Sequence, residues 1–391
     1  MSRFFFTAFA LLTETGLQAA SPSVVLWSGP GILFASLMIA WGAEAAQFFL
    51  AQGLALALLA LLQTLPEFAA EAIFAWHRET SYLLASLTGA LMLLTGLGWP
   101  MIYFSAATAH RRAHKSAMRR IQLDEEQAVQ VISLVAAIIY EFVIWWKGSL
   151  NIFDGTILIA IYVGYLLVMR RLPPEEPETL DEISGVPKAI VLATKPVRII
   201  SIGVLFVIGG AAVFLLADPF LAGLFGLSTI LGVSRFQFVQ WIYPLVSEAP
   251  EGISAFYWAR DYKRASIALM NLVSSNINQW TLLAALLPMV LSLSMRQQTA
   301  IHLDPTQSRD LLLALSQSLL GSFFLLNMEL SWWEAVGLFL MFLVQLRWAE
   351  THAVLTKIYF VWCGIELLRL ITGNRKAVAL RHFREIVHLR R

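Results

Sequence analysis

Apolar residues gather along the chain into eleven runs, most of them about 20 residues long, with polar stretches between them. A helix of that length and composition crosses the hydrocarbon core of a bilayer. The pattern therefore predicts eleven membrane-spanning helices. Their expected bounds are 24–46, 48–76, 81–106, 126–147, 152–171, 197–217 (or on to 232), 236–259, 265–293, 309–328, 332–348 and 353–372.

The order of these runs repeats. In each half a long apolar helix leads to a helix broken at a Pro-Glu pair, then to a helix rich in small residues, then to two more spans. The two Pro-Glu pairs, at 66–67 and 250–251, stand at matching places in the two halves. Because five spans is an odd number, the halves must enter the membrane in opposite orientations. This predicts an inverted repeat, a layout common among secondary transporters.

The fold class expected is therefore an all-α integral membrane protein of about 10–11 transmembrane helices, built as two inverted five-helix repeats plus an extra C-terminal helix. The N-terminal 23 residues fit either a cleaved signal peptide or a lead-in to the first span. The expected organisation is a lead-in or signal-like segment 1–23, a first repeat 24–171, an acidic Pro-rich cytoplasmic linker 172–196, a second repeat 197–348, an extra span 353–372 and a basic cytoplasmic tail 373–391.

Composition and charge agree with this topology. The chain is 58% hydrophobic and only 14% charged, against roughly a quarter charged in soluble domains. Of its 28 Lys and Arg residues, most lie in stretches that fall on one side if the eleven spans alternate. The positive-inside rule predicts that this side, with the C-terminal tail, is cytoplasmic, and we expect a plasma (inner) membrane protein. We expect the basic tail to lie as a helix on anionic membrane lipid rather than to bind nucleic acid.

Two glutamates stand out against this apolar background. Glu67 and Glu251 each follow a helix-breaking proline near the middle of a predicted span. An ionisable group at that depth costs several kcal/mol unless it is paired. Opposed repeats would bring both carboxylates and the loosened backbone together at the midplane. Such an oxygen-rich, negative cage suits a hard cation, above all calcium. The alternative is that the glutamates are protonated and serve helix packing.

The segments LQTLPE and VSEAPE resemble the Gly-Thr-Ser-x-Pro-Glu signature of sodium/calcium exchangers, the calcium:cation antiporter superfamily. The eighth span contains MNLVSSNINQW, which is similar to that family's G-N-x-x-G-S-N-x-x-N element. The resemblance in layout covers 24–348, and its specific motifs cover four short stretches. The chain is thus identified as a divergent member of the family.

The resemblance implies a set of cation-binding residues, with Glu67 and Glu251 as the metal-binding carboxylates. Thr64 and Ser247 occupy the hydroxyl positions before the Pro-Glu pairs. Asn271 and Asn276 are five residues apart and do not share a helical face, so only one of them is expected to face the site. The cation-binding set comprises Glu67, Glu251, Glu248, Thr64, Ser247, Asn271, Ser275 and Asn276.

Departures from the family pattern bear on the ion that is exchanged. Glu248 stands where the second signature would have a serine, and it adds a carboxylate three residues before Glu251. The third span has lost its asparagines and keeps only Ser86, Thr88 and Gly89. Fewer neutral oxygen ligands put separate sodium sites in doubt. Two close carboxylates cannot both ionise cheaply, which favours holding a proton. Glu71, one turn after Glu67, points either to the same cavity or to a packing contact, and we favour packing.

The resemblance implies a secondary active antiporter that exchanges calcium or a related cation for sodium or protons by alternating access. The alternative is a degenerate relative that no longer transports and acts as a membrane binding or scaffold protein, which the degraded motifs suggest. An enzyme is not expected, because the sequence has no metalloprotease, nucleophile-elbow or P-loop motif. No cofactor is expected beyond the transported calcium, sodium or proton, and oligomeric state cannot be predicted.

Overall fold

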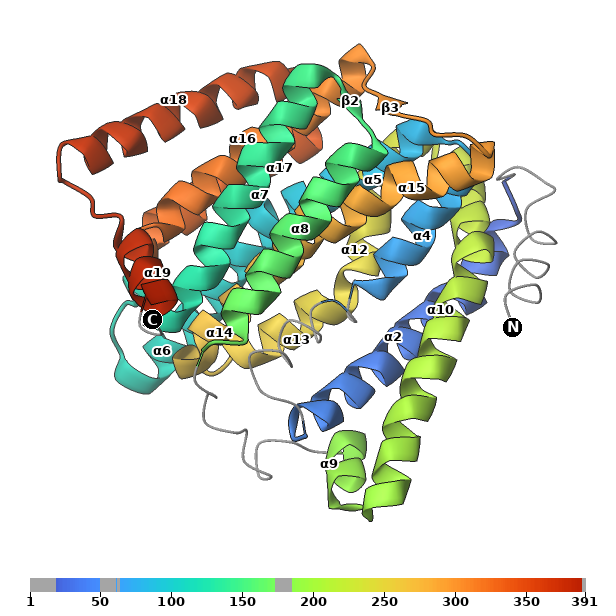
Figure 1. Cartoon of the computed structure of the whole chain (residues 1–391), viewed down its shortest axis with the longest axis horizontal. Helices are drawn as coiled ribbons and strands as arrows, with labels where there is room; N and C mark the ends of the chain where they lie inside the picture. The colour runs from blue at the N-terminus through green and yellow to red at the C-terminus, as the bar shows by residue number, and fades with distance from the viewer. Residues whose placement is uncertain (1–18, 50–60, 62–63, 173–184, 389–391) are drawn as a thin grey trace.

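The protein folds into a bundle of helices that run roughly alongside one another (Figure 1). The computed structural model describes residues 19–49, 61, 64–172 and 185–388. The first half contains η1 (Pro22–Val24), α2 (Val25–Gln47), α4 (Leu65–Trp76), α5 (Thr80–Leu93), η2 (Leu94–Gly98), α6 (Trp99–His114), β1 (Arg120–Gln122), η3 (Glu125–Gln127), α7 (Ala128–Lys147), β2 (Ser149–Leu150) and α8 (Ile152–Met169).

The second half repeats this order after a short helix. It contains α9 (Gly185–Leu192), α10 (Lys195–Leu231), α11 (Arg235–Gln237), η4 (Phe238–Ile242), α12 (Tyr243–Ser247), α13 (Ala249–Ala259), η5 (Tyr262–Arg264), α14 (Ala265–Asn278), η6 (Gln279–Leu283), α15 (Ala284–Met295), β3 (Ile301–His302), α16 (Pro305–Leu325), β4 (Glu329–Ser331), α17 (Trp332–Arg347), η7 (Ala349–Thr351), α18 (His352–Ile371) and α19 (Val378–His388). η2, η4 and η6 are single turns of π-helix, a form often found at functional sites.

These elements confirm the predicted all-α membrane fold. In the described residues, six continuous helices are long and apolar enough to cross a membrane. The predicted spans 236–259, 309–328, 332–348 and 353–372 coincide with helices that are shorter, interrupted or more polar. The six are Pro22–Ala46, Thr80–His114, Glu125–Lys147, Ile152–Met169, Lys195–Leu231 and Tyr262–Met295.

Several helix ends follow directly from local sequence. Asn151 accepts a hydrogen bond from the backbone N–H of Asp154 (3.0 Å), whose carboxylate accepts one from the N–H of Asn151 (2.8 Å). This reciprocal cap starts α8. Gly148, with φ of +71°, ends α7 in the left-handed conformation that glycine adopts without strain.

Two short antiparallel ladders show the inversion of the halves. β1, after the third span, pairs with β4, between the ninth and tenth spans. β2, between the fourth and fifth spans, pairs with β3, between the eighth and ninth. Each ladder therefore joins loops that alternating spans place on the same side of the membrane. The central pairs in register are Ile121 with Leu330 and Leu150 with Ile301.

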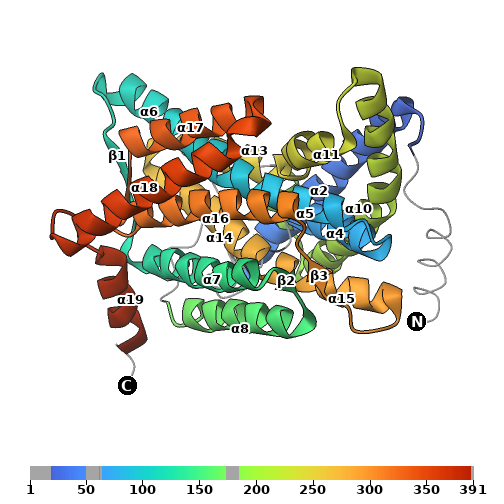
Figure 2. The same ribbon diagram turned by 90° about the horizontal axis from the view of Figure 1, so that it is seen from above.

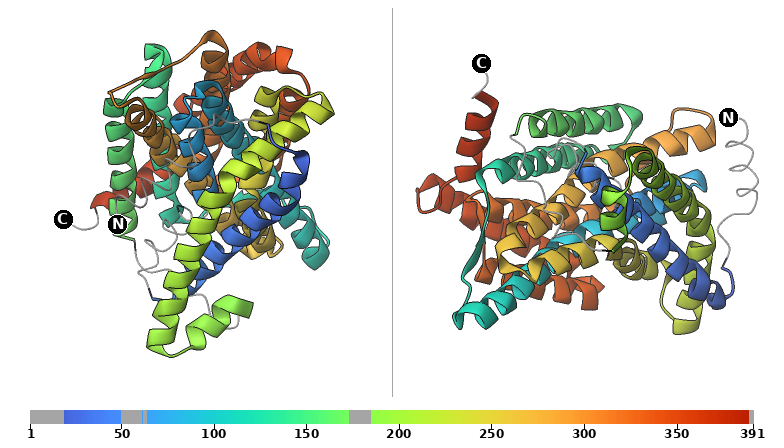
Figure 3. Two further views of the ribbon diagram at one scale, coloured as in Figure 1. Left: turned by 90° about the vertical axis from the view of Figure 1, so that its right-hand side faces the viewer. Right: turned by 90° about the horizontal axis from the view of Figure 1, so that it is seen from below.

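The helices that open the two halves, α2 and α10, pack against each other along one side of the bundle (Figures 1 and 3). A Cβ atom at Gly209 would lie 2.9 Å from the carbonyl oxygen of Ala35, so a small residue is needed there. On another side α7 lies between α8 and α16 (Figure 2). The core between these layers holds the broken helices.

The sixth span follows the longer alternative, since α10 runs on to Leu231. Of the predicted span 48–76, residues 50–60 and 62–63 lie outside the described part. The tail helix α19 packs against α7 and η3, and its contact with lipid stays a prediction. Its anchor is the buried Arg375, which forms ion pairs with Glu334 (2.7 Å) and Glu366 (2.6 Å).

Candidate functional site

Both Pro-Glu pairs open a short helix. Thr64 precedes α4, whose first turn contains Pro66 and Glu67. In the second half α12 ends at Ser247, and α13 begins at Ala249 with its proline and Glu251 in the first turn. Proline is tolerated in a first turn because its missing N–H has no partner there. Each glutamate thus sits at a helix N-terminus, where the helix dipole favours negative charge.

The carboxylates of the two halves meet at one amide. The side-chain N–H₂ of Gln279, the first residue of η6, donates one hydrogen bond to Glu67 (2.8 Å) and one to Glu248. The hydroxyl of Ser247 also donates to Glu67 (3.4 Å). Glu67 comes from the first half and the other three residues from the second. The inverted halves therefore share one buried polar centre.

This centre is closed off from solvent. Glu67, Glu248 and Glu251 have exposed fractions between 1% and 3%. Three carboxyl groups at this depth create a strongly unfavourable environment unless positive charge or protons compensate them.

Many oxygens in the centre have no hydrogen-bond partner within the described residues. They include both carboxylate oxygens of Glu251, the second oxygen of Glu248 and the amide oxygens of Asn276 and Gln279. Buried polar atoms are normally paired, so such a cluster calls for an explanation. Carboxylate and amide oxygens are the ligands that hard cations accept. These carboxylate and amide oxygens are therefore suited to bind a hard cation.

Carboxylates alone do not complete such a site. Within the described ranges, no group of three or more His, Cys, Asp and Glu side chains is arranged to hold a metal ion. Amide and hydroxyl oxygens would have to contribute, as is usual for calcium, which takes about six to eight oxygen ligands.

The remaining predicted ligands lie on or next to the same elements. Ser275 and Asn276 are four and three residues before Gln279 on α14, so all three share a face. Ser275 also lies close to Glu251, and its hydroxyl donates to the carbonyl oxygen of Asn271 (3.2 Å). The hydroxyl of Thr64 donates to the carbonyl oxygen of Leu61 (2.9 Å). The roles of these residues in cation binding stay predictions.

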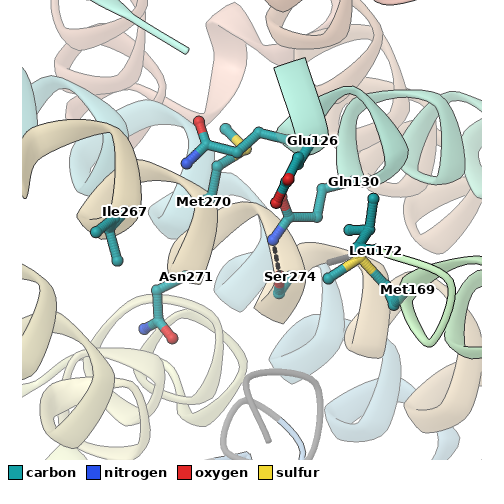
Figure 4. Close-up of a pocket in the computed structure, with 9 residues that line it drawn as sticks. Glu126, Gln130, Met169, Leu172, Ile267, Met270, Asn271 and Ser274 are labelled. Atoms are coloured by element: carbon teal, nitrogen blue, oxygen red, sulfur yellow. Dashed lines mark hydrogen bonds between the residues drawn. The ribbon is translucent and has the colours of Figure 1, made fainter. Parts of the chain in front are cut away.

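Asn271 lies at a different place, in a small cavity of about 30 Å³ between α14, α7 and α8 (Figure 4). In this cavity Gln130 of α7 donates a hydrogen bond to the hydroxyl of Ser274 (3.2 Å). Glu126 lines the cavity as well. Asn271 is thus about two helical turns from Gln279 along the chain, and its role in cation binding stays a prediction.

Sequence reasoning missed Gln279, although a signal was present. The residue occupies the last polar position of the Asn-rich element, three residues after Asn276. Glu71 is fully buried, with both oxygens unpartnered in the described residues, and it interacts electrostatically with Glu67. Whether Glu71 takes part in cation binding or serves helix packing stays a prediction. Tyr243, buried beside these carboxyls, had no signal in the sequence.

The comparisons agree with this geometry. The family model described as "Sodium/calcium exchanger protein" matches residues 21–170 and 201–349. Among solved structures, the chain is similar to the H⁺/Ca²⁺ exchanger CAX, at 32% identity and a TM-score of 0.86, covering 98% of this chain and 95% of that one. The sodium-calcium exchanger NCX_Mj shares the fold, at 18% identity and a TM-score of 0.56, covering 83% of this chain and 97% of that one. No curated protein sequence matches.

Proposed function

Because the chain belongs to the sodium/calcium exchanger family, we propose that it is a secondary antiporter that exchanges calcium for protons by alternating access. It is a transporter rather than an enzyme. The observation that carries this proposal is the Gln279 amide that links Glu67 of one half to Glu248 of the other.

Calcium binds at the buried centre. The carboxylate ligands come from Glu67, Glu248 and Glu251, no more than two of them at once in the described arrangement. Gln279 and Asn276 supply amide oxygens that lack hydrogen bonds within the described residues. Ser247, Ser275 and Thr64 add hydroxyl oxygens nearby. This mixture of charged and neutral oxygens matches the preference of a hard divalent cation.

Protons, rather than sodium, occupy the centre when calcium leaves. Glu67 and Glu248 are both within hydrogen-bond reach of one amide group, so two negative charges there would repel strongly in a dry site. A proton relieves that repulsion. The third span offers no asparagine for separate sodium sites. The similar exchanger CAX is described as an H⁺/Ca²⁺ exchanger, which supports this choice.

Alternating access moves the paired helices α2 and α10 against the rest of the bundle. Their contact with each other is extensive, and inverted-repeat transporters open to either side by rocking one unit around a fixed site. Exchange is obligatory because an empty, charged site is costly to carry through the barrier. The cavity at Asn271 (Figure 4) lies toward the side that the positive-inside rule assigns to the cytoplasm of a plasma (inner) membrane.

The test is ion flux in proteoliposomes. An imposed proton gradient should drive calcium uptake by the wild type, and Glu67→Gln or Glu251→Gln should abolish it. Glu350→Gln, at an exposed glutamate, is the matched control and should transport normally. If a sodium gradient at equal pH drove calcium uptake, sodium rather than the proton would be the exchanged ion. Unchanged coupled flux in both glutamine variants would refute the mechanism. A wild type without any ion-dependent flux or thermal shift would favour the alternative of a scaffold that no longer transports.

A further inference from the structure

A large groove lies outside the proposed transport site, on the face where α6, α13 and α17 meet. Its volume is about 860 Å³. Leu97, Phe104, Phe256 and Phe339 are among the residues that form its apolar walls. Phe256 has an exposed fraction of 44%, so the groove opens to the surroundings of the bundle.

One end of the groove is positively charged. Arg112, near the end of α6, and Arg260, directly after α13, both line it and are exposed. Neither guanidinium forms a hydrogen bond or ion pair within the described part of the chain. No acidic residue lines the groove, so nothing within it balances the two positive charges.

The two arginines lie at the same end of the bundle. The ring of Tyr262, which follows α13, is 5.2 Å from the ring of His110 and 5.1 Å from that of His114 on α6. This contact brings the ends of the two helices together. Under the positive-inside rule this end is the cytoplasmic one.

The length of the groove matches one leaflet. From Leu97 to Arg112 the chain rises about 22 Å along η2 and α6. One leaflet, with its polar headgroup region, is about 20–22 Å thick. An acyl chain laid along the apolar walls would therefore place its headgroup at the arginines. Ser105 and Thr108, which also line the groove, offer hydroxyl groups near that end.

We propose that this groove binds an anionic phospholipid of the cytoplasmic leaflet, with its phosphate between Arg112 and Arg260 and an acyl chain along α6. Arginine forms bidentate hydrogen bonds with phosphate, and basic pockets between transmembrane helices are suited to anionic headgroups. The bound lipid contacts elements of both halves, since α6 belongs to the first and α13 and α17 to the second. α13 is also the helix whose first turn contains Glu251.

The experiment is native mass spectrometry of the full chain, purified in detergent and titrated with phosphatidylglycerol or with phosphatidylcholine of the same acyl chains. No transported ion is needed, so the outcome is independent of the exchange mechanism. The wild type should retain phosphatidylglycerol in preference to phosphatidylcholine. R112Q/R260Q should weaken phosphatidylglycerol binding by about tenfold or more, because each basic residue contributes to headgroup attraction.

Two further variants keep the proposal falsifiable. R170Q/R171Q removes the same charge from the same side at exposed residues outside the groove and should bind like the wild type. Ser105→Trp fills the groove while keeping both arginines and should also lose the lipid. Equal binding of the two lipids by the wild type would overturn the proposal. So would an equal loss in the control, or lipid binding unaffected by both groove variants.

Discussion

In the first half, α5 is followed by a π-helical turn that begins with Leu94. In the second half, α14 is followed at the matching place by a π-helical turn that begins with Gln279. Both places have the same π-helical backbone. Leu94 is an apolar, buried residue there, whereas the side chain of Gln279 donates hydrogen bonds to two carboxylates. The repeat therefore fixes where the elements lie, while single side chains decide which half supplies the amide that joins the two carboxylates.

The same contrast holds about one and a half turns earlier in each helix. At Gly89 of α5, a Cβ atom would lie 1.8 Å from the carbonyl oxygen of Gln240, so α5 contacts η4 through bare backbone. The matching position of α14 is Ser274, whose hydroxyl accepts a hydrogen bond from Gln130. One half uses the position for close packing and the other for a polar cavity.

The largest effect is expected when the residues that begin the two π-helical turns are exchanged. Gln279→Leu removes two hydrogen bonds to carboxylates, each contributing about 1.5–3 kcal/mol. We expect calcium affinity to fall at least about tenfold, measured as the concentration giving half-maximal uptake into proteoliposomes. The matched variant Leu94→Gln leaves the centre intact and should keep wild-type affinity. Wild-type affinity in Gln279→Leu would contradict the role of this amide.

A second variant tests the close packing in the first half. Gly89→Ala forces α5 away from the backbone of η4, and overpacking of this kind costs about 1–3 kcal/mol. A lower midpoint of thermal unfolding in detergent should follow. The control is Gly164→Ala on α8, where an added Cβ would meet nothing within 4 Å. If both variants unfolded at the wild-type temperature, the contact would be looser than described.

The smallest effect is expected at Glu71, a carboxyl that the second half lacks, since Ala255 stands at the matching position after the second Pro-Glu pair. Glutamine preserves its size and one of its oxygen ligands, and Glu67 remains in place. Glu71→Gln should therefore change calcium affinity by no more than about fivefold, as determined by calorimetry on the purified protein. Complete loss of calcium binding would contradict this expectation and would indicate that Glu71 is a principal calcium ligand.

Much of the fold could be predicted, because apolar length and period are local properties. The Pro-Glu pairs located the breaks at Glu67 and Glu251, and the odd number of spans predicted the inversion that the strand ladders show. The tail was different. Its basic, amphipathic pattern predicts lipid contact, which stays a prediction. The ion pairs of Arg375 with two distant glutamates attach the start of the tail to the protein, and no local pattern in the sequence indicates them.

The site could be predicted only as far as its motifs reach. Glu248 was recognised from its place in a degraded signature, and it does lie in the buried centre with Glu67. Gln279 is far from Glu67 along the chain, and no sequence pattern shows the helix rotation that brings the two together. What surrounds the Glu71 side chain likewise depends on how α4 is rotated relative to α5, which no sequence pattern shows.

The most direct test of the central claim is to count the protons released when calcium binds. Calorimetric titration of the purified protein with calcium, repeated in buffers of different ionisation enthalpy at one pH, gives that number. If one centre holds either calcium or protons, the measured heat should depend on the buffer and correspond to about one to two protons released per calcium, with no binding in Glu67→Gln/Glu251→Gln. Calcium binding with buffer-independent heat, or binding that survives the double substitution, would contradict it.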